Sequence, residues 1–201
     1  MHVILNGIVR GSGLLSGADG GCESDMVHRM NEGYRAWRVL KSVPSNRGLG
    51  ITAKKCLYEG VSVPTALYGA DSWGMSGGES AERRKVNVLE KKCLRRLIGV
   101  SRMDRVRNEE VHRRAEIERE LASRAGQRVL RWFGHVESMD EYRVARTVLM
   151  AEVKGGRVRG RPRFGWMDGV KVALGNIGMT VEAAPQFVEI GKSVETCFIC
   201  N

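Results

Sequence analysis

The chain has 201 residues, of which 42% are hydrophobic, and it carries 33 Lys and Arg against 23 Asp and Glu. The net charge of +10 favours a polyanionic partner over a neutral one. The five cysteines show no regular spacing, and the apolar start of the chain is short and interrupted by Gly and Arg, which argues against a disulfide framework, a signal peptide and a membrane protein. We therefore expect a protein of a reducing, intracellular compartment, with one domain or two small ones.

The positive charge is concentrated in two blocks. Residues 81–131 hold 16 Lys and Arg against 8 Asp and Glu, and residues 143–174 hold 8 against 2. A single basic residue often belongs to a solvated surface. Two separate basic blocks in one short chain instead indicate a site for a polyanion.

The N-terminal 24 residues are rich in glycine and predict one strand at residues 2–9, with no partner strand in the chain. Residues 25–41 predict a helix that has Asp25 near its start and Gly33 inside it. Its apolar residues recur at steps of three and four: Val27, Met30, Tyr34, Trp37 and Leu40.

Residues 52–61 predict a second helix, which Pro64 kinks or ends. Residues 81–98 give the clearest helix, because apolar residues form one stripe and basic residues cover the other faces. Ser80 is expected to cap its N-terminus and Gly99 its C-terminus. The apolar stripe consists of Val86, Leu89, Cys93, Leu94, Leu97 and Ile98.

Further helices are expected at residues 108–117, 119–137 and 141–153, followed by a short one at 167–178. The Gly and Pro content of residues 156–165 predicts a loop, and the helical signal fades after Thr180. The expected fold is therefore mainly α. It is a small helical bundle with an N-terminal strand, an Arg/Gly-rich loop and a weakly ordered C-terminal tail.

The sequence GRVRGRPR at residues 156–163 forms a short cationic ribbon, here called the strap. Its arginines occupy alternate positions: Arg157, Arg159, Arg161 and Arg163. Arg-Gly-Arg-Pro matches the core of the AT-hook, whose arginines enter the narrow minor groove of A·T-rich DNA. The strap is thus a general nucleic-acid contact, an AT-hook or a solvated loop. Trp166 follows it and either stacks on a base or anchors the loop to the helices.

No cluster of residues predicts an active site. His135 lacks a nearby serine or cysteine motif, and we interpret it as a structural histidine. Cys197 and Cys200 have the spacing of a zinc knuckle but no second pair of ligands nearby. The sequence also has no adjacent aspartates for Mg²⁺ and no phosphate-binding glycine loop. We expect no metal site and no cofactor.

Four sequence motifs, in this order and spacing, resemble the region that follows the polymerase palm in non-LTR (LINE-type) retrotransposon polyproteins. They are LYGADSW (67–73), AERRKVNVLEKKCLRRLIGVSRMDRVRNEEVHRR (81–114), RVLRWFGHVESMD (128–140) and GRVRGRPRFGWMDGV (156–170). The resemblance covers roughly residues 20–183. The tail departs from the family's usual charged ending, as a frameshifted or decayed copy would.

The resemblance implies the context of an RNA-directed DNA polymerase, with an endonuclease further upstream. It also implies a location in the nucleus or cytoplasm. This family carries a Tyr-x-Asp-Asp metal-binding motif in its palm, and the present chain has no such sequence. The implied organisation is an end-of-palm remnant and connecting helix (1–50), a thumb-like bundle (51–140), a basic segment with the strap (141–180) and a tail (181–201).

A thumb holds the backbone of the template–primer duplex, so the expected partner is an RNA–DNA hybrid or another duplex, together with the missing palm and fingers. The four strap arginines and Trp166 are candidate contacts. The candidate backbone contacts on the helices are Arg83, Arg84, Lys91, Arg95, Arg96, Arg128 and Arg131.

Three hypotheses for function remain open at this stage. The chain is a non-catalytic module that binds nucleic acid, or an RNA-directed DNA polymerase by family. Alternatively it is a decayed fragment without function, whose former contact with a palm is exposed.

Overall fold

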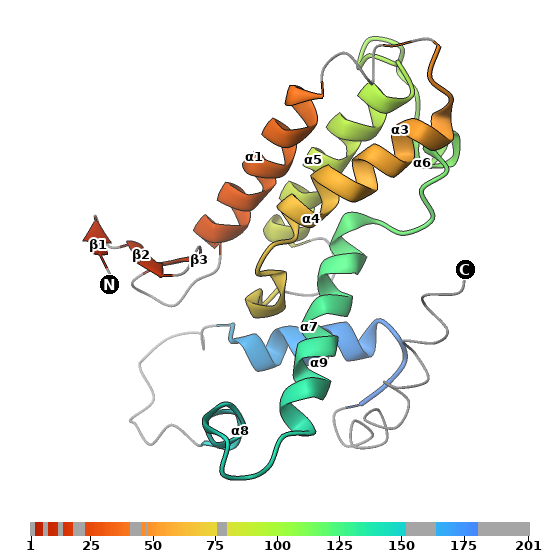
Figure 1. Cartoon of the computed structure of the whole chain (residues 1–201). Helices are drawn as coiled ribbons and strands as arrows, with labels where there is room; N and C mark the ends of the chain where they lie inside the picture. Colours follow the sequence, from red (N-terminus) through yellow and green to blue (C-terminus); the bar gives the residue numbers. More distant parts are fainter. Residues whose placement is uncertain are drawn as a thin grey trace.

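The computed structural model describes residues 3–5, 8–11, 14–17, 23–40, 46, 48–75, 80–151 and 164–180. A small N-terminal sheet is followed by helices (Figure 1), which confirms the expected, mainly helical fold. The predicted strap and the tail after Thr180 lie outside the described residues. In the part of the chain that the structure describes, no helix is long and apolar enough to cross a bilayer.

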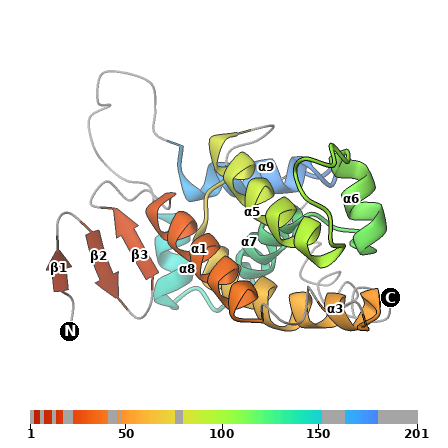
Figure 2. The same cartoon turned by 90° about the horizontal axis from the view of Figure 1, so that it is seen from above.

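Three short strands form an antiparallel sheet in chain order: β1 (Val3–Leu5), β2 (Ile8–Gly11) and β3 (Leu14–Gly17). Val3 pairs with Arg10 in the first ladder, and Ile8 pairs with Gly17 in the second. The prediction of a single strand without a partner was therefore wrong. The Asn-Gly dipeptide between β1 and β2 is typical of a tight hairpin, a signal that this prediction overlooked. Figure 2 shows the sheet beside the start of the first helix.

Helix α1 (Glu23–Val39) confirms the helix predicted from Asp25 onward. Gly33 lies inside α1 at the point where α1 packs closely against the later helix that contains Ala66. A Cβ atom built on Gly33 would lie 2.6 Å from the Cβ of Ala66. The hydroxyl of Ser62 donates to the Gly33 carbonyl oxygen at 2.9 Å, which fixes this close approach.

The second helical stretch continues past Pro64 and does not end there. It consists of α3 (Ile51–Leu57), a π-helical turn η1 (Tyr58–Ser62) and α4 (Val63–Ala66). Because proline has no N–H and its ring needs room at the preceding turn, the wider π turn accommodates it without breaking the path. The 3₁₀ turn η2 (Ala70–Ser72) follows Gly69, which has the left-handed φ of 71°.

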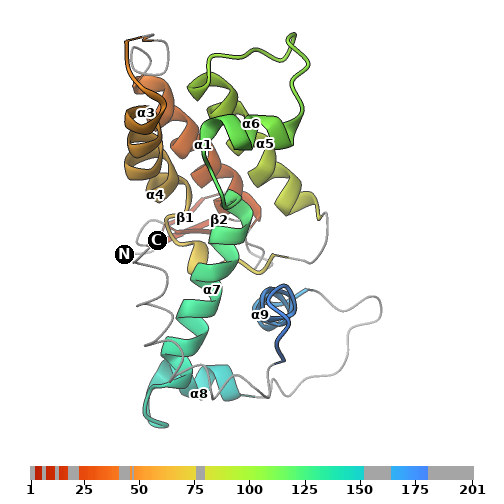
Figure 3. The ribbon, with the colours of Figure 1, turned by 90° about the vertical axis from the view of Figure 1, so that its right-hand side faces the viewer.

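Helix α5 (Ala81–Leu97) begins where the capping prediction placed it, because the Ser80 side chain accepts the Arg83 N–H. Gly99 follows its end with φ of 74°. The remaining helices are α6 (Asn108–Ala115), α7 (Leu121–Glu137), α8 (Val144–Met150) and α9 (Trp166–Gly175). Figure 3 shows that α7 runs from the group of α3, α5 and α6 to α8, with α9 beside it.

The buried side chains form two clusters. The larger one fills the space between α1, α3–α4, α5, α6 and the start of α7, and it includes the fully buried Trp37 and Trp73. The smaller one joins the second half of α7 to α9 and contains Val129, Phe133, Val170 and Leu174. A long α7 therefore belongs to both clusters and connects them.

A buried carboxyl group links α5 to α7. Glu90 is 1% exposed, and its Oε1 accepts the N–H of Leu121, the first residue of α7, at 2.9 Å. Its Oε2 lies 3.7 Å from Nε2 of His112 in α6, which is too far for a hydrogen bond. Burial raises the pKa of Glu90 to about 7 and lowers the pKa of His112, so burial outweighs the attraction between the two groups.

Replacing Glu90 should change how stability depends on pH. In the unfolded chain Glu90 ionises above about pH 4.5, whereas the folded protein keeps it protonated up to about pH 7. Its stabilising effect is therefore complete below pH 4.5 and is lost as the pH rises to about 7. The free energy of unfolding of Glu90→Gln minus that of wild type should therefore increase by up to about 3 kcal/mol as the pH rises from 4.5 to 8.

Urea unfolding at several pH values measures this gain. Because His112 lies 3.7 Å from Glu90, the comparison is repeated in a His112→Gln background, in which that imidazole no longer titrates. Curves for wild type and Glu90→Gln that stay parallel across this range would contradict the burial of a protonated Glu90.

The contact between α1 and α4 should tolerate no side chain at position 33. Gly33→Ala would force its new methyl group into Ala66 and should destabilise the fold by about 1–3 kcal/mol. Gly60→Ala is the matched control, since no atom lies within 4 Å of the Cβ it adds, and it should be neutral or stabilising. Thermal melting followed by circular dichroism compares the two, and equal effects would refute the close approach.

Candidate nucleic-acid interface

Three of the candidate cations on α5 are engaged in holding the bundle together. Arg83 and Lys91 approach the carboxylate of Glu120, at 3.2 Å and 3.9 Å. Arg95 donates to the carbonyl of Val106 at 2.8 Å and to the side chain of Asn108 at 3.0 Å. These groups fix α5 against the loop before α6 and against the start of α7, and so they are less available to a ligand than the sequence suggests.

The other two candidates on α5, Arg84 and Arg96, differ in exposure. Arg84 is exposed, but it has a further interaction within the chain. Arg96 is half-buried in the last turn of α5, next to the final residue Leu97. The structure therefore does not gather the α5 cations into one free basic surface.

Helix α7 carries a more continuous basic face. Leu121 to Val136 contain no Asp or Glu, whereas Arg124, Arg128 and Arg131 recur at steps of four and three residues. Arg124 is paired with Glu59 of the π turn at 2.9 Å. Arg128 is half-buried and donates to the carbonyl of Leu67 at 3.2 Å, while Arg131 is exposed.

Aromatic rings accompany these arginines. Trp132 is 42% exposed, and the centre of its ring lies 5.5 Å from the centre of the His135 ring, at an interplanar angle of 47°. Tyr68, which follows the carbonyl held by Arg128, is 52% exposed, and the Arg29 guanidinium lies 4.6 Å from the centre of its ring. We call the set Arg29, Tyr68, Arg128, Arg131, Trp132 and His135 the α7 outer face.

Sequence reasoning missed Tyr68, Trp132 and Arg29 as candidates. It interpreted His135 as a structural histidine. The missed signal is the spacing of Arg128, Arg131, Trp132 and His135, which at i, i+3, i+4 and i+7 share one side of a helix. Tyr68 gave no such signal, because its place beside α7 depends on tertiary packing.

Trp166 occupies an anchoring position. Its indole N–H donates to the carbonyl of Asp71 at 2.9 Å, and its ring lies 6.3 Å from that of Phe133. These contacts tie the start of α9 to η2 and α7. The strap arginines Arg157, Arg159, Arg161 and Arg163 lie outside the described residues, between the end of α8 and this anchor.

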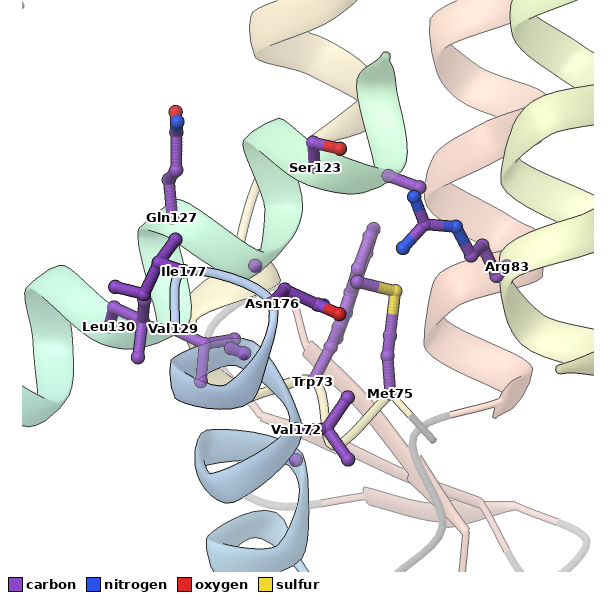
Figure 4. A pocket seen from close by; sticks show the side chains of 14 residues that line it. Trp73, Met75, Arg83, Ser123, Gln127, Val129, Leu130, Val172, Asn176 and Ile177 are labelled. Carbon is purple, nitrogen blue, oxygen red and sulfur yellow. The ribbon is translucent and has the colours of Figure 1, made fainter. Parts of the chain in front are cut away.

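A groove of about 360 Å³ lies between α7, α9 and the segment after η2. Figure 4 shows Trp73 and Met75 on one side of it and Arg83 at one end. Its walls are mostly apolar, and Arg83 is already paired with Glu120. The described residues contain no group of three His, Cys, Asp or Glu side chains that could hold a metal ion.

No protein-family model, no curated protein and no solved structure matches this chain. The residues and their geometry are therefore the basis for assigning a function.

If Trp166 serves as an anchor, Trp166→Phe should lower stability without changing nucleic-acid affinity. The variant loses the hydrogen bond to Asp71 and should be about 1 kcal/mol less stable. Phenylalanine keeps an aromatic ring, so Trp166→Leu is the companion variant that also removes stacking. Thermal melting and oligonucleotide binding below the melting temperature test both variants, and weaker binding by the folded Leu variant would favour base stacking.

Proposed function

We propose that this chain is a non-catalytic, nucleic-acid-binding part of a retrotransposon-type polymerase. The observation that carries the proposal is the α7 outer face. It combines exposed Arg131, half-buried Arg128 and exposed Trp132 on a helix with no acidic residue before Glu137. Such a face attracts phosphates through the arginines and offers a ring to a base or sugar.

The arrangement of the family-like motifs supports the same proposal. The LYGADSW motif packs against the RVLRWFGHVESMD motif, because Arg128 binds the carbonyl of Leu67. The motif with the strap joins them, because Trp166 binds the carbonyl of Asp71. Three sequence motifs that lie far apart in the chain thus share one region of the fold, as expected if they serve one function.

In this proposal the chain contributes binding, and the missing palm and fingers contribute catalysis. Arg131 contacts backbone phosphates, and the strap arginines add contacts between α8 and α9. Arg83, Lys91 and Arg95 position the helices for this role, as their contacts with Glu120, Val106 and Asn108 support.

The decayed-fragment hypothesis also has an observation in its favour. Four large apolar side chains on or beside α8 are more than half exposed: Tyr142, Val144, Val148 and Met150. A fragment that has lost its palm would expose such a surface and aggregate. Light scattering of the purified chain distinguishes this hypothesis from a stable module.

The binding proposal predicts a salt-dependent affinity with a defined contribution from Arg131. The logarithm of the binding constant for an RNA–DNA hybrid should fall linearly with the logarithm of the salt concentration, with a slope worth about four or more phosphates. Arg131→Gln should weaken binding several-fold and lower the slope by about one. Fluorescence anisotropy across a salt series measures both quantities.

Arg113→Gln is the matched control, because it removes the same charge from an exposed arginine that is paired with Glu110 on α6. A second variant with Gln at all four strap arginines tests the strap. Binding by the strap variant that equals wild type with an unchanged slope would remove the strap from the interface. Negligible binding by wild type at moderate salt would refute the proposed function.

A further inference from the structure

The exposure of Trp132 differs from that of the other tryptophans. Trp37 and Trp73 are fully buried, and Trp166 is half-buried with its N–H bonded, whereas 42% of Trp132 meets solvent. A large ring on a surface forgoes the stabilisation that burial provides. Its neighbours on the same helix face are cationic, because Arg128 and Arg131 lie within one turn of it.

Tyr68 is a second exposed aromatic residue, and contacts with α1 hold its ring in place. The Arg29 guanidinium lies over the ring, and Arg29 in turn approaches the Asp25 carboxylate at 3.4 Å. Asp25 is 2% exposed and accepts the indole N–H of Trp73 at 3.1 Å. Tyr68 is thus supported by a chain of contacts that ends in the core, so little conformational freedom remains to be lost when a ligand binds it.

Arg128 lies between the two rings along the chain of contacts. It binds the carbonyl of Leu67, next to Tyr68, and Trp132 follows it by one helical turn, a rise of about 6 Å. The order along these contacts is therefore Tyr68, Arg128 and Trp132, and Arg131 lies three residues after Arg128 on α7.

This pattern fits unpaired bases better than a duplex. In a duplex the faces of the bases are stacked on one another, so an aromatic ring on a helix surface cannot reach them. Unpaired bases expose their faces, and each base stacked on an aromatic side chain contributes about 1–3 kcal/mol regardless of its identity. Arginines alone would serve a duplex backbone, and the two exposed rings would then have no use.

Building on the proposed function, we propose that the α7 outer face binds an unpaired segment of RNA or DNA. One base stacks on Trp132 and another on Tyr68, while Arg131 contacts the intervening phosphate and Arg128 holds the segment of Tyr68 against α7. The ligand is thus a single strand beside the duplex, and its recognition depends on stacking and charge, independent of base sequence.

The test uses the full chain with three probes of equal length: a fluorescein-labelled oligo(dT) strand, its DNA duplex and an RNA–DNA hybrid. Trp132→Ala should weaken binding of the single strand by about 5- to 100-fold, and Tyr68→Ala should do so by a similar factor. Both should change binding of either duplex by less than about twofold. Trp132→Phe retains a stacking ring and should recover most of the single-strand affinity.

Further controls make the outcomes distinct. Trp132 is exposed, so its variants should keep the melting temperature of wild type within a few degrees, and Val88→Ala on α5 controls for the loss of an exposed apolar side chain. If wild type binds none of the probes, the proposed function fails. Suppose that wild type binds all three probes with the expected salt slope, but that Trp132→Ala and Tyr68→Ala bind the single strand as wild type does. This inference alone is then overturned, and the exposed rings would be assigned to contact with a protein partner.

Discussion

The position of α7 depends on one buried hydrogen bond, from the Leu121 N–H to the Glu90 carboxyl. The side chain of Glu120, the residue before α7, does not cap the helix. The Glu90 carboxyl of α5 instead accepts the first free N–H of α7. Glu120 is instead held by Arg83 and Lys91. Because α7 belongs to both hydrophobic clusters, the geometry at its start determines where its outer face lies relative to Tyr68 and where α9 can dock.

Charge in this protein has two uses that composition cannot separate. Helix α5 carries seven Lys and Arg residues, yet Arg83, Lys91 and Arg95 mainly connect helices. On α6, Arg113 and Arg114 are both bound to Glu110 and lower its pKa to about 2. The basic residues without such partners in the described structure are fewer, and Arg131 is among them.

Local sequence signals predicted the helices well and the contacts between them poorly. The stripe and the Ser80 cap located α5 to within a residue, because both signals lie within a few positions of the helix they define. The pairing of β1 with β2 was missed, and so was the contact of Arg83 with Glu120, 37 residues away. The α7 outer face was half predicted: its arginines follow from helical spacing, whereas the support of Tyr68 by Arg29 and Asp25 exists only after packing.

The π turn at Tyr58–Ser62 determines how this helical stretch responds to the loss of one residue. Such a turn corresponds to one extra residue in an α-helix, and here it faces two of its members, Tyr58 and Ser62, into the core just before Pro64. Removing the exposed Gly60 would let the turn close as regular α-helix, so α3 and α4 would keep their relative orientation and Tyr58 its edge-on contact with Trp37. A single-codon deletion at this turn is therefore expected to preserve the packing of α3, whereas the same deletion in the middle of α5 would rotate one half of that helix by about 100° relative to the other.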